Sequence, residues 1–178
     1  MLAADPPVVA VPHVRAVDPA LLPYIREGCR RSPTFHALVE RIEHSDVIVY
    51  LESVTFVPPL TRAYLRWVGA NTMFRFVRIA VKIPASTDSI IALLGHELHH
   101  ASEVAAAIDV RDEAAFDALF RRVGEQSPGG WETAAARLAG ALVKKELLSQ
   151  DSAAPATAPT GPIPAAQPAL SATPTVRR

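Results

Sequence analysis

The chain has 178 residues and carries 18 basic and 18 acidic side chains, so its formal net charge at neutral pH is zero. This length suits one domain with a buried core, and because no basic stripe with interleaved aromatic residues is present, we expect no nucleic acid partner. The single cysteine, Cys29, excludes an internal disulfide framework.

Two helices are predicted near the N-terminus. Residues 1–17 are rich in proline and valine but show neither helical nor alternating periodicity, so we expect a poorly structured segment there. The first helix should cover residues 20–31, with Asp18 as its N-cap and Pro19 at its first position. A second helix should follow over residues 32–44, where apolar residues recur at helical spacing.

Three strands are predicted next. Residues 46–52 form a short β-branched run, which is typical of a strand. Residues 64–68 and 74–82 are predicted as two strands of a hairpin, joined by a turn at residues 69–72 that begins with glycine. Two arginines interrupt the alternation of the second hairpin strand and suggest a partly exposed or edge-like face: Arg75 and Arg78.

The second half of the chain predicts three more helices. The first begins at Ser86 or Thr87 and runs to about Ala107. The others cover residues 111–123 and about 131–148 and are separated by a Pro-Gly-Gly break. Residues 150–178 are alanine, proline, threonine and serine with almost no charge, so they predict a disordered tail. Together these elements predict an α+β fold for a single domain over residues 18–149.

One of these helices carries the pattern H-E-x-x-H. Residues four apart lie on one face of a helix, so His96 and His100 can direct ring nitrogens at one metal ion, while Glu97 reaches a water molecule held there. The preceding apolar run, residues 90–94, indicates a buried helix, in which polar groups are costly unless they are paired or bind an ion. His99 lies roughly 100° around the helix from His100 and is expected to point away from the pair.

The order of a short sheet, an H-E-x-x-H helix and further helices resembles that of the zincin metallopeptidases. The likeness covers about residues 46–148, but only the five-residue motif is specific. It implies a bound zinc ion, Zn2+, with His96 and His100 as ligands and Glu97 as the general base that activates the metal-bound water. It also implies that a strand beside the helix holds a peptide substrate, for which residues 74–82 or 46–52 are the candidates.

A catalytic zinc usually takes three protein ligands, so a third is expected. The longer motif H-E-x-x-H-x-x-G-x-x-H is absent, because Glu103 and Ala106 stand at its glycine and third histidine positions, which argues against the metzincin branch. The gluzincin branch takes a glutamate from near the start of a later helix, and this resemblance favours Glu132. Glu103 stays the alternative, as third ligand or as hydrogen-bond partner of a ligand histidine, since it lies on the same helix face as His96 and His100.

The resemblance therefore implies a zinc-dependent hydrolase, in the simplest case a small metallopeptidase that acts on a peptide or protein substrate. The first alternative is a non-catalytic zincin-like module that binds metal or presents a surface to another protein. The second is a helical interaction protein in which the motif is incidental. Catalysis would also need a residue that stabilises the oxyanion, and six residues are candidates: Tyr50, Tyr64, Arg66, Arg75, Arg78 and His99.

The sequence predicts neither a membrane span nor a secretion signal. No apolar run has the length of a span, and the first residues lack the basic start and long apolar run of a signal peptide. A cytoplasmic protein is the default expectation, although a true start further upstream would still allow an export signal.

Overall fold

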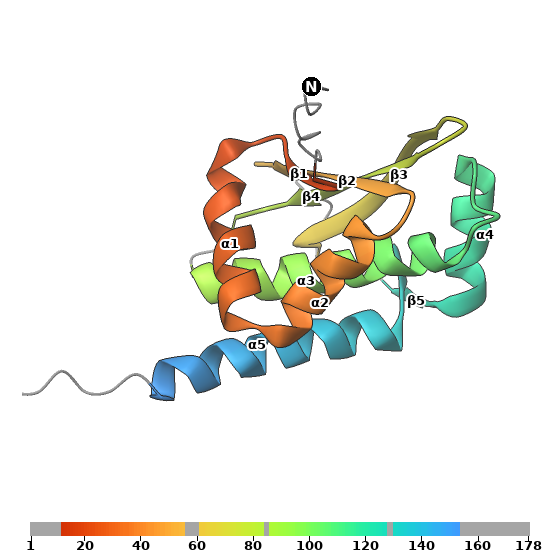
Figure 1. Cartoon of the computed structure of the whole chain (residues 1–178). Coiled ribbons are helices and arrows are strands. Elements are labelled where there is room, and N and C mark those ends of the chain that lie inside the picture. The colour runs from red at the N-terminus through yellow and green to blue at the C-terminus, as the bar shows by residue number, and fades with distance from the viewer. Residues whose placement is uncertain (1–11, 56–60, 84–85, 128–129, 154–178) are drawn as a thin grey trace, which may run out of the picture.

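The computed structural model describes residues 12–55, 61–83, 86–127 and 130–153 of the chain. Over these residues the fold is α+β, with a four-stranded mixed sheet that helices cover on one face (Figure 1). β1, β2 and β4 are parallel, whereas β3 is antiparallel to β4 and forms one edge of the sheet. The strands lie in the order β1 (Val14–Ala16), β2 (Val47–Ser53), β4 (Arg75–Val81) and β3 (Ala63–Ala70).

Helices and a short hairpin complete the described structure. α3 packs beneath the sheet and α5 packs beneath α3, so α3 occupies the middle of three layers (Figure 1). A 3-10 turn, Pro19–Leu21, leads into the first α-helix. The elements are α1 (Leu22–Arg31), α2 (Pro33–Glu43), α3 (Thr87–Ala106), α4 (Glu113–Val123), β5 (Glu125–Ser127), β6 (Gly130–Glu132) and α5 (Ala134–Ala153).

The central position of α3 follows from its composition. Residues two apart in a strand share a face, and alternate residues of β2 and β4, such as Val49 and Ile79, are fully buried. Ile91, Leu94 and Leu98 of α3 are also 0 % exposed and belong to the same core. A helix with buried apolar residues on all sides needs covering on both faces, which the sheet and α5 provide.

Two glycines allow α3 and α5 to pack closely. A Cβ added at Gly95 would lie 2.9 Å from Cγ2 of Val143. A Cβ added at Gly140 would lie 3.1 Å from Cβ of His96 and 3.3 Å from the carbonyl oxygen of Ala92. α5 therefore runs directly against the turn of α3 that carries His96, and any larger residue at position 140 would press on that histidine.

The predicted hairpin and the helices that match α1 to α4 are confirmed to within a few residues. β1 lies inside the segment 1–17, for which no structure was predicted, because three residues are too few to show alternation. The prediction that the last helix starts near residue 131 was wrong, since Trp131 and Glu132 belong to β6 and α5 starts at Ala134. α5 also extends through Ala153, into the predicted tail of residues 150–178. The rest of that tail, residues 154–178, lies outside the described residues.

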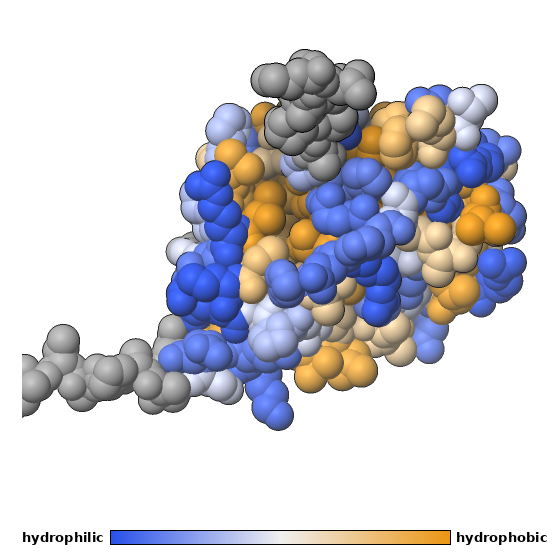
Figure 2. Space-filling model, viewed as in Figure 1, coloured by the Kyte–Doolittle hydropathy of each residue, from blue (hydrophilic) through white to orange (hydrophobic). Residues whose placement is uncertain are grey.

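Some apolar side chains reach the surface. Leu138 and Leu142 of α5 are 60 % and 39 % exposed, and Figure 2 shows apolar surface along the lower edge of the molecule, where α5 lies. None of the helices within the described ranges has both the length and the apolar character that a membrane crossing requires.

Candidate metal centre

The motif side chains lie in the middle of α3. This helix begins at Thr87, directly after its N-cap Ser86, whose hydroxyl accepts a hydrogen bond from the N–H of Ser89 at 3.3 Å. His96 and His100 follow one helical turn apart, with ring centroids separated by 5.0 Å. His100 is buried, and its ring also packs edge-on against Phe120 of α4 at 5.3 Å.

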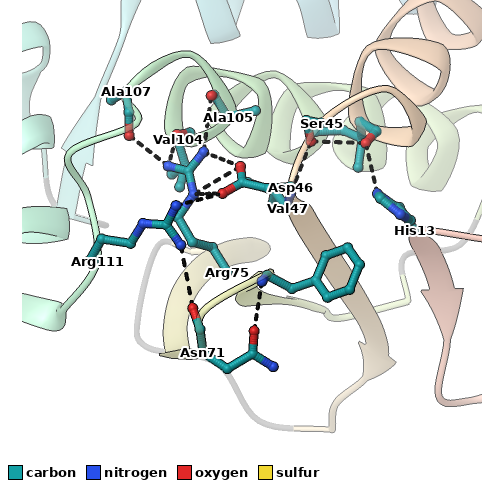
Figure 3. Close-up of polar contacts among 12 residues, drawn as sticks. His13, Ser45, Asp46, Val47, Asn71, Arg75, Val104, Ala105, Ala107 and Arg111 are labelled. Carbon is teal, nitrogen blue, oxygen red and sulfur yellow. Dashed lines mark hydrogen bonds and ion pairs between the residues drawn. The ribbon is translucent and has the colours of Figure 1, made fainter.

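Arg75 anchors the C-terminal end of α3 to the sheet (Figure 3). Its fully buried side chain donates to the carbonyl oxygens of Val104 and Ala107, both at 2.6 Å, and its Nε lies 3.0 Å from the carboxylate of Asp46. These carbonyl groups lie at the end of α3, where the regular helical hydrogen bonds stop, and together with Asp46 they compensate the buried charge of Arg75. The interpretation of Arg75 as the mark of an exposed or edge-like face was therefore wrong. β4 is an interior strand, and only Arg78 of its two arginines is partly exposed.

Glu132, the last residue of β6, brings a carboxylate to the two histidines. Its Oε2 lies 3.1 Å from Nε2 of His96, and its Oε1 lies 3.2 Å from Nε2 of His100. One donor atom from each of these three side chains lies within 4.8 Å of the others, so the group could hold a metal ion. Glu132 was expected in the first turn of a helix, whereas it stands at the end of a strand, two residues before α5.

Glu103 lies behind His100. One of its oxygens is 2.8 Å from Nδ1 of His100, and the other accepts a hydrogen bond from the hydroxyl of Thr133 at 2.8 Å. In the tautomer in which Nδ1 donates to Glu103, Nε2 is the nitrogen that faces His96 and Glu132. Carboxylates in this position orient metal-binding histidines and increase their basicity. Of the two roles considered for Glu103, the geometry supports that of a hydrogen-bond partner.

The charges within the group reinforce one another. Burial alone would lower the pKa of His100, but hydrogen bonds with Glu103 and Glu132 outweigh it and raise that pKa to about 9. Burial likewise opposes ionisation of Glu132, yet the hydrogen bonds with His100 and His96 lower its pKa to about 2. The surroundings therefore favour positive charge between the rings. A metal cation benefits from the same surroundings, because it binds the nitrogen lone pair that a proton would otherwise occupy.

Glu97 lines the same cavity as the three donors. It is 5 % exposed, and burial raises its pKa to about 7 against the opposing influence of His100 and His96. The backbone of Leu65 in β3 forms a hydrogen bond with it. The cavity has a volume of about 490 Å³, and its walls come from α3, β3, α4 and the β5–β6 hairpin; among them are Leu93, residues 61–65, Phe116, Phe120 and Trp131.

The strand that lines this cavity is β3. The expected substrate strands, residues 74–82 and 46–52, form β4 and β2, which lie inside the sheet, so that expectation was wrong. Within the described residues β3 pairs with β4 alone, and the backbone of Leu65 reaches Glu97. Among the oxyanion candidates, Tyr64 is the one found in the described lining of the cavity.

The donor atoms suit a divalent first-row metal. Two imidazole nitrogens and one carboxylate oxygen form a borderline donor set, and three protein donors leave a further coordination position for a small molecule. Because all three donors line the cavity, that position would be accessible from it. His99 is outside the group, as expected, with its Nε2 3.7 Å from Glu103.

Thr133 is the residue of this site that sequence analysis missed. It is 3 % exposed, and its hydroxyl accepts a hydrogen bond from the N–H of Ala136 at 3.1 Å, the geometry of an N-cap. A threonine before a run of alanines is a helix-start signal. This signal is present in the sequence, but the helix start predicted near Trp131 lies before it.

Comparison with known proteins assigns no family to this site. No family model matches the chain. Searches of curated proteins and of solved structures found no significant match either. The metal-binding capacity of His96, His100 and Glu132 therefore rests on their geometry alone.

Proposed function

We propose that this protein is a zinc-dependent hydrolase of peptide bonds with a zincin-like site. The observation that carries the proposal is that His96, His100 and Glu132 converge on one point of a cavity that Glu97 also lines. Two histidines and one glutamate are a ligand set found at catalytic zinc sites, whereas structural sites usually have four protein ligands. The glutamate donor favours the gluzincin branch, although here it comes from a strand end.

The chain supplies the groups that hydrolysis needs. A bound zinc ion would provide a Lewis acid and a position at which the pKa of a water molecule falls towards neutrality. Glu97 is the base that takes a proton from the attacking water and passes it to the leaving amine. Its burial shields the carboxylate from bulk solvent, and the backbone of Leu65 orients it.

The substrate we propose is an extended peptide held along β3. In the part of the chain that the structure describes, no strand pairs with the outer side of this edge strand, and a peptide can add to such an edge through backbone hydrogen bonds. Phe116 and Phe120 of α4 contact one another with centroids 4.9 Å apart and form an apolar wall of the cavity. That wall favours peptides with an apolar side chain near the scissile bond.

Metal analysis and one substitution test the proposal. Purified protein should carry about one zinc ion per chain, as expected for three protein ligands. Glu97→Gln should retain the zinc but lose hydrolysis of a fluorogenic peptide library by about 10²–10⁴-fold, because the base is gone. Glu40→Gln makes the same change at an exposed position of α2 and should leave both zinc content and activity unchanged.

The non-catalytic module is the second candidate, and one observation favours it. Glu132 contacts both histidines across the gap between β6 and α3, so a metal ion there would also tie the hairpin to the helix layer. Zinc-loaded wild-type protein that is as inert as Glu97→Gln on the whole library would favour the module over the hydrolase. Absence of zinc binding would remove both candidates.

A further inference from the structure

The hydroxyl of Thr133 joins the two segments that carry the metal donors. It accepts from the N–H of Ala136 at 3.1 Å and donates to Glu103 at 2.8 Å. Glu103 in turn contacts Nδ1 of His100 at 2.8 Å, and Glu132 is the neighbour of Thr133 in the chain. One buried side chain, directly after the strand donor Glu132 in the chain, thus contacts both the start of α5 and Glu103, the partner of the helix donor His100.

We infer that Thr133 is a positioning residue of the metal centre, an inference that rests on the proposed zinc site. Its hydroxyl fixes one oxygen of Glu103, so that the other oxygen stays on Nδ1 of His100 and leaves Nε2 available. Its cap on α5 also fixes the backbone that follows Glu132 directly. Both actions reach the donors through other groups, because the threonine itself is not among the three donors.

Loss of this hydroxyl should weaken metal binding beyond its effect on the helix. Without Thr133 as a donor, the carboxylate of Glu103 keeps its contact with His100, and its other oxygen loses the bond that fixes it. Loss of a residue that holds a metal ligand through hydrogen bonds commonly lowers metal affinity by about 10–100-fold. A cap on a helix that carries no donor lowers helix stability when it is lost, without contacting a ligand or its hydrogen-bond partner.

The experiment compares zinc affinity across four variants, with a chromophoric chelator as competitor. Thr133→Val should bind zinc about tenfold or more weakly. Thr133→Ser keeps a hydroxyl that can both donate and accept, so it should restore wild-type affinity. Thr133→Gly keeps a residue tolerated at an N-cap but offers no donor to Glu103, and it should also bind weakly.

Asp112→Ala is the control for loss of a cap. Asp112 accepts from the N–H of Ala115 at 2.8 Å at the start of α4, away from the zinc donors. It should lower the melting temperature and leave zinc affinity unchanged. If Thr133→Val does not fold, Thr133→Gly decides the question. Folded Thr133→Gly or Thr133→Val with wild-type affinity would overturn the positioning role while the zinc site stands. Wild-type protein that binds no zinc would overturn both.

Discussion

The ring of His100 is held at both of its nitrogens. Nδ1 lies 2.8 Å from Glu103 and Nε2 lies 3.2 Å from Glu132. The protonation of each nitrogen therefore depends on the carboxylate that it contacts. A metal ion needs an unprotonated nitrogen, and a carboxylate on Nδ1 keeps the proton on the far side of the ring. Glu103 is therefore expected to decide which nitrogen can bind.

Glu103→Gln should exchange the nitrogen of His100 that carries the proton for the other one. The hydroxyl of Thr133 would bond to the amide oxygen, which turns the amide nitrogen towards His100. An N–H donor there requires Nδ1 to accept and moves the proton to Nε2. We expect zinc affinity to fall by about 10–100-fold, measured by chelator competition.

His99→Gln is the matched comparison for that substitution. His99 neighbours Glu103 at 3.7 Å but is outside the group of donors, so its replacement should leave zinc affinity near the wild-type value. Equal affinities for wild type and Glu103→Gln would show that the carboxylate does not control the ring.

At the scale of elements, the donor cluster is one of the links that attach the β5–β6 hairpin to the helices. Glu132 contacts His96 and His100, and the adjoining Thr133 contacts Glu103. The ion pair between Arg137 and Glu125 at 3.3 Å is exposed on both sides and contributes little. A bound metal would add the strongest of these links.

Removal of zinc with a chelator should therefore loosen the hairpin selectively. We expect faster amide hydrogen exchange in β5 and β6, with little change in β2 and α1, which lie in or against the core and do not contact the donors. Exchange measured by mass spectrometry before and after chelation checks this. Protection that stays constant in the hairpin, or falls equally everywhere, would contradict it.

Sequence analysis succeeded where local pattern determines structure. The spacing of His96 and His100 and the cap at Ser86 are local features of one helix, and they appear in the structure as α3. The three-residue strands β1, β5 and β6 carry no readable alternation, so they were missed. Their existence depends on pairing with segments that are distant or polar.

The order of the strands could not be predicted from the sequence for a related reason. β2 and β4 are neighbours although β3 comes between them in the chain, and nothing in a single sequence specifies that crossover. Arg75 was misjudged because a charged residue in a strand usually indicates exposure. Its acceptors belong to the end of α3, and only the folded molecule brings them near.

At the scale of the whole molecule, the pair of Asp46 and Arg75 links the sheet to α3. Hydrogen bonds from Arg75 lower the pKa of Asp46, with burial opposing and the charges of Arg75 and Arg111 assisting. A depressed pKa means that the pair stabilises the fold fully above the unfolded pKa of about 3.9. This stabilisation is lost as the pH falls through the lower, folded value.

Asp46→Asn should test that link. At pH 7 the free energy of unfolding should fall by about 1–3 kcal/mol, because the buried guanidinium loses its charged partner. The difference from wild type should be constant between about pH 5 and 7 and should narrow below about pH 4, where Asp46 of the wild type becomes protonated. Denaturant unfolding at several pH values measures it, and a gap that widens on acidification would contradict the assignment.

The three donors are nitrogen and oxygen atoms, while the single thiol of the chain, Cys29, sits half-buried in α1, where burial raises its pKa and suppresses the thiolate. Sulfur oxidation reaches none of the donor atoms. If the centre binds a metal ion as proposed, its loading should therefore not depend on the oxidation of a thiol.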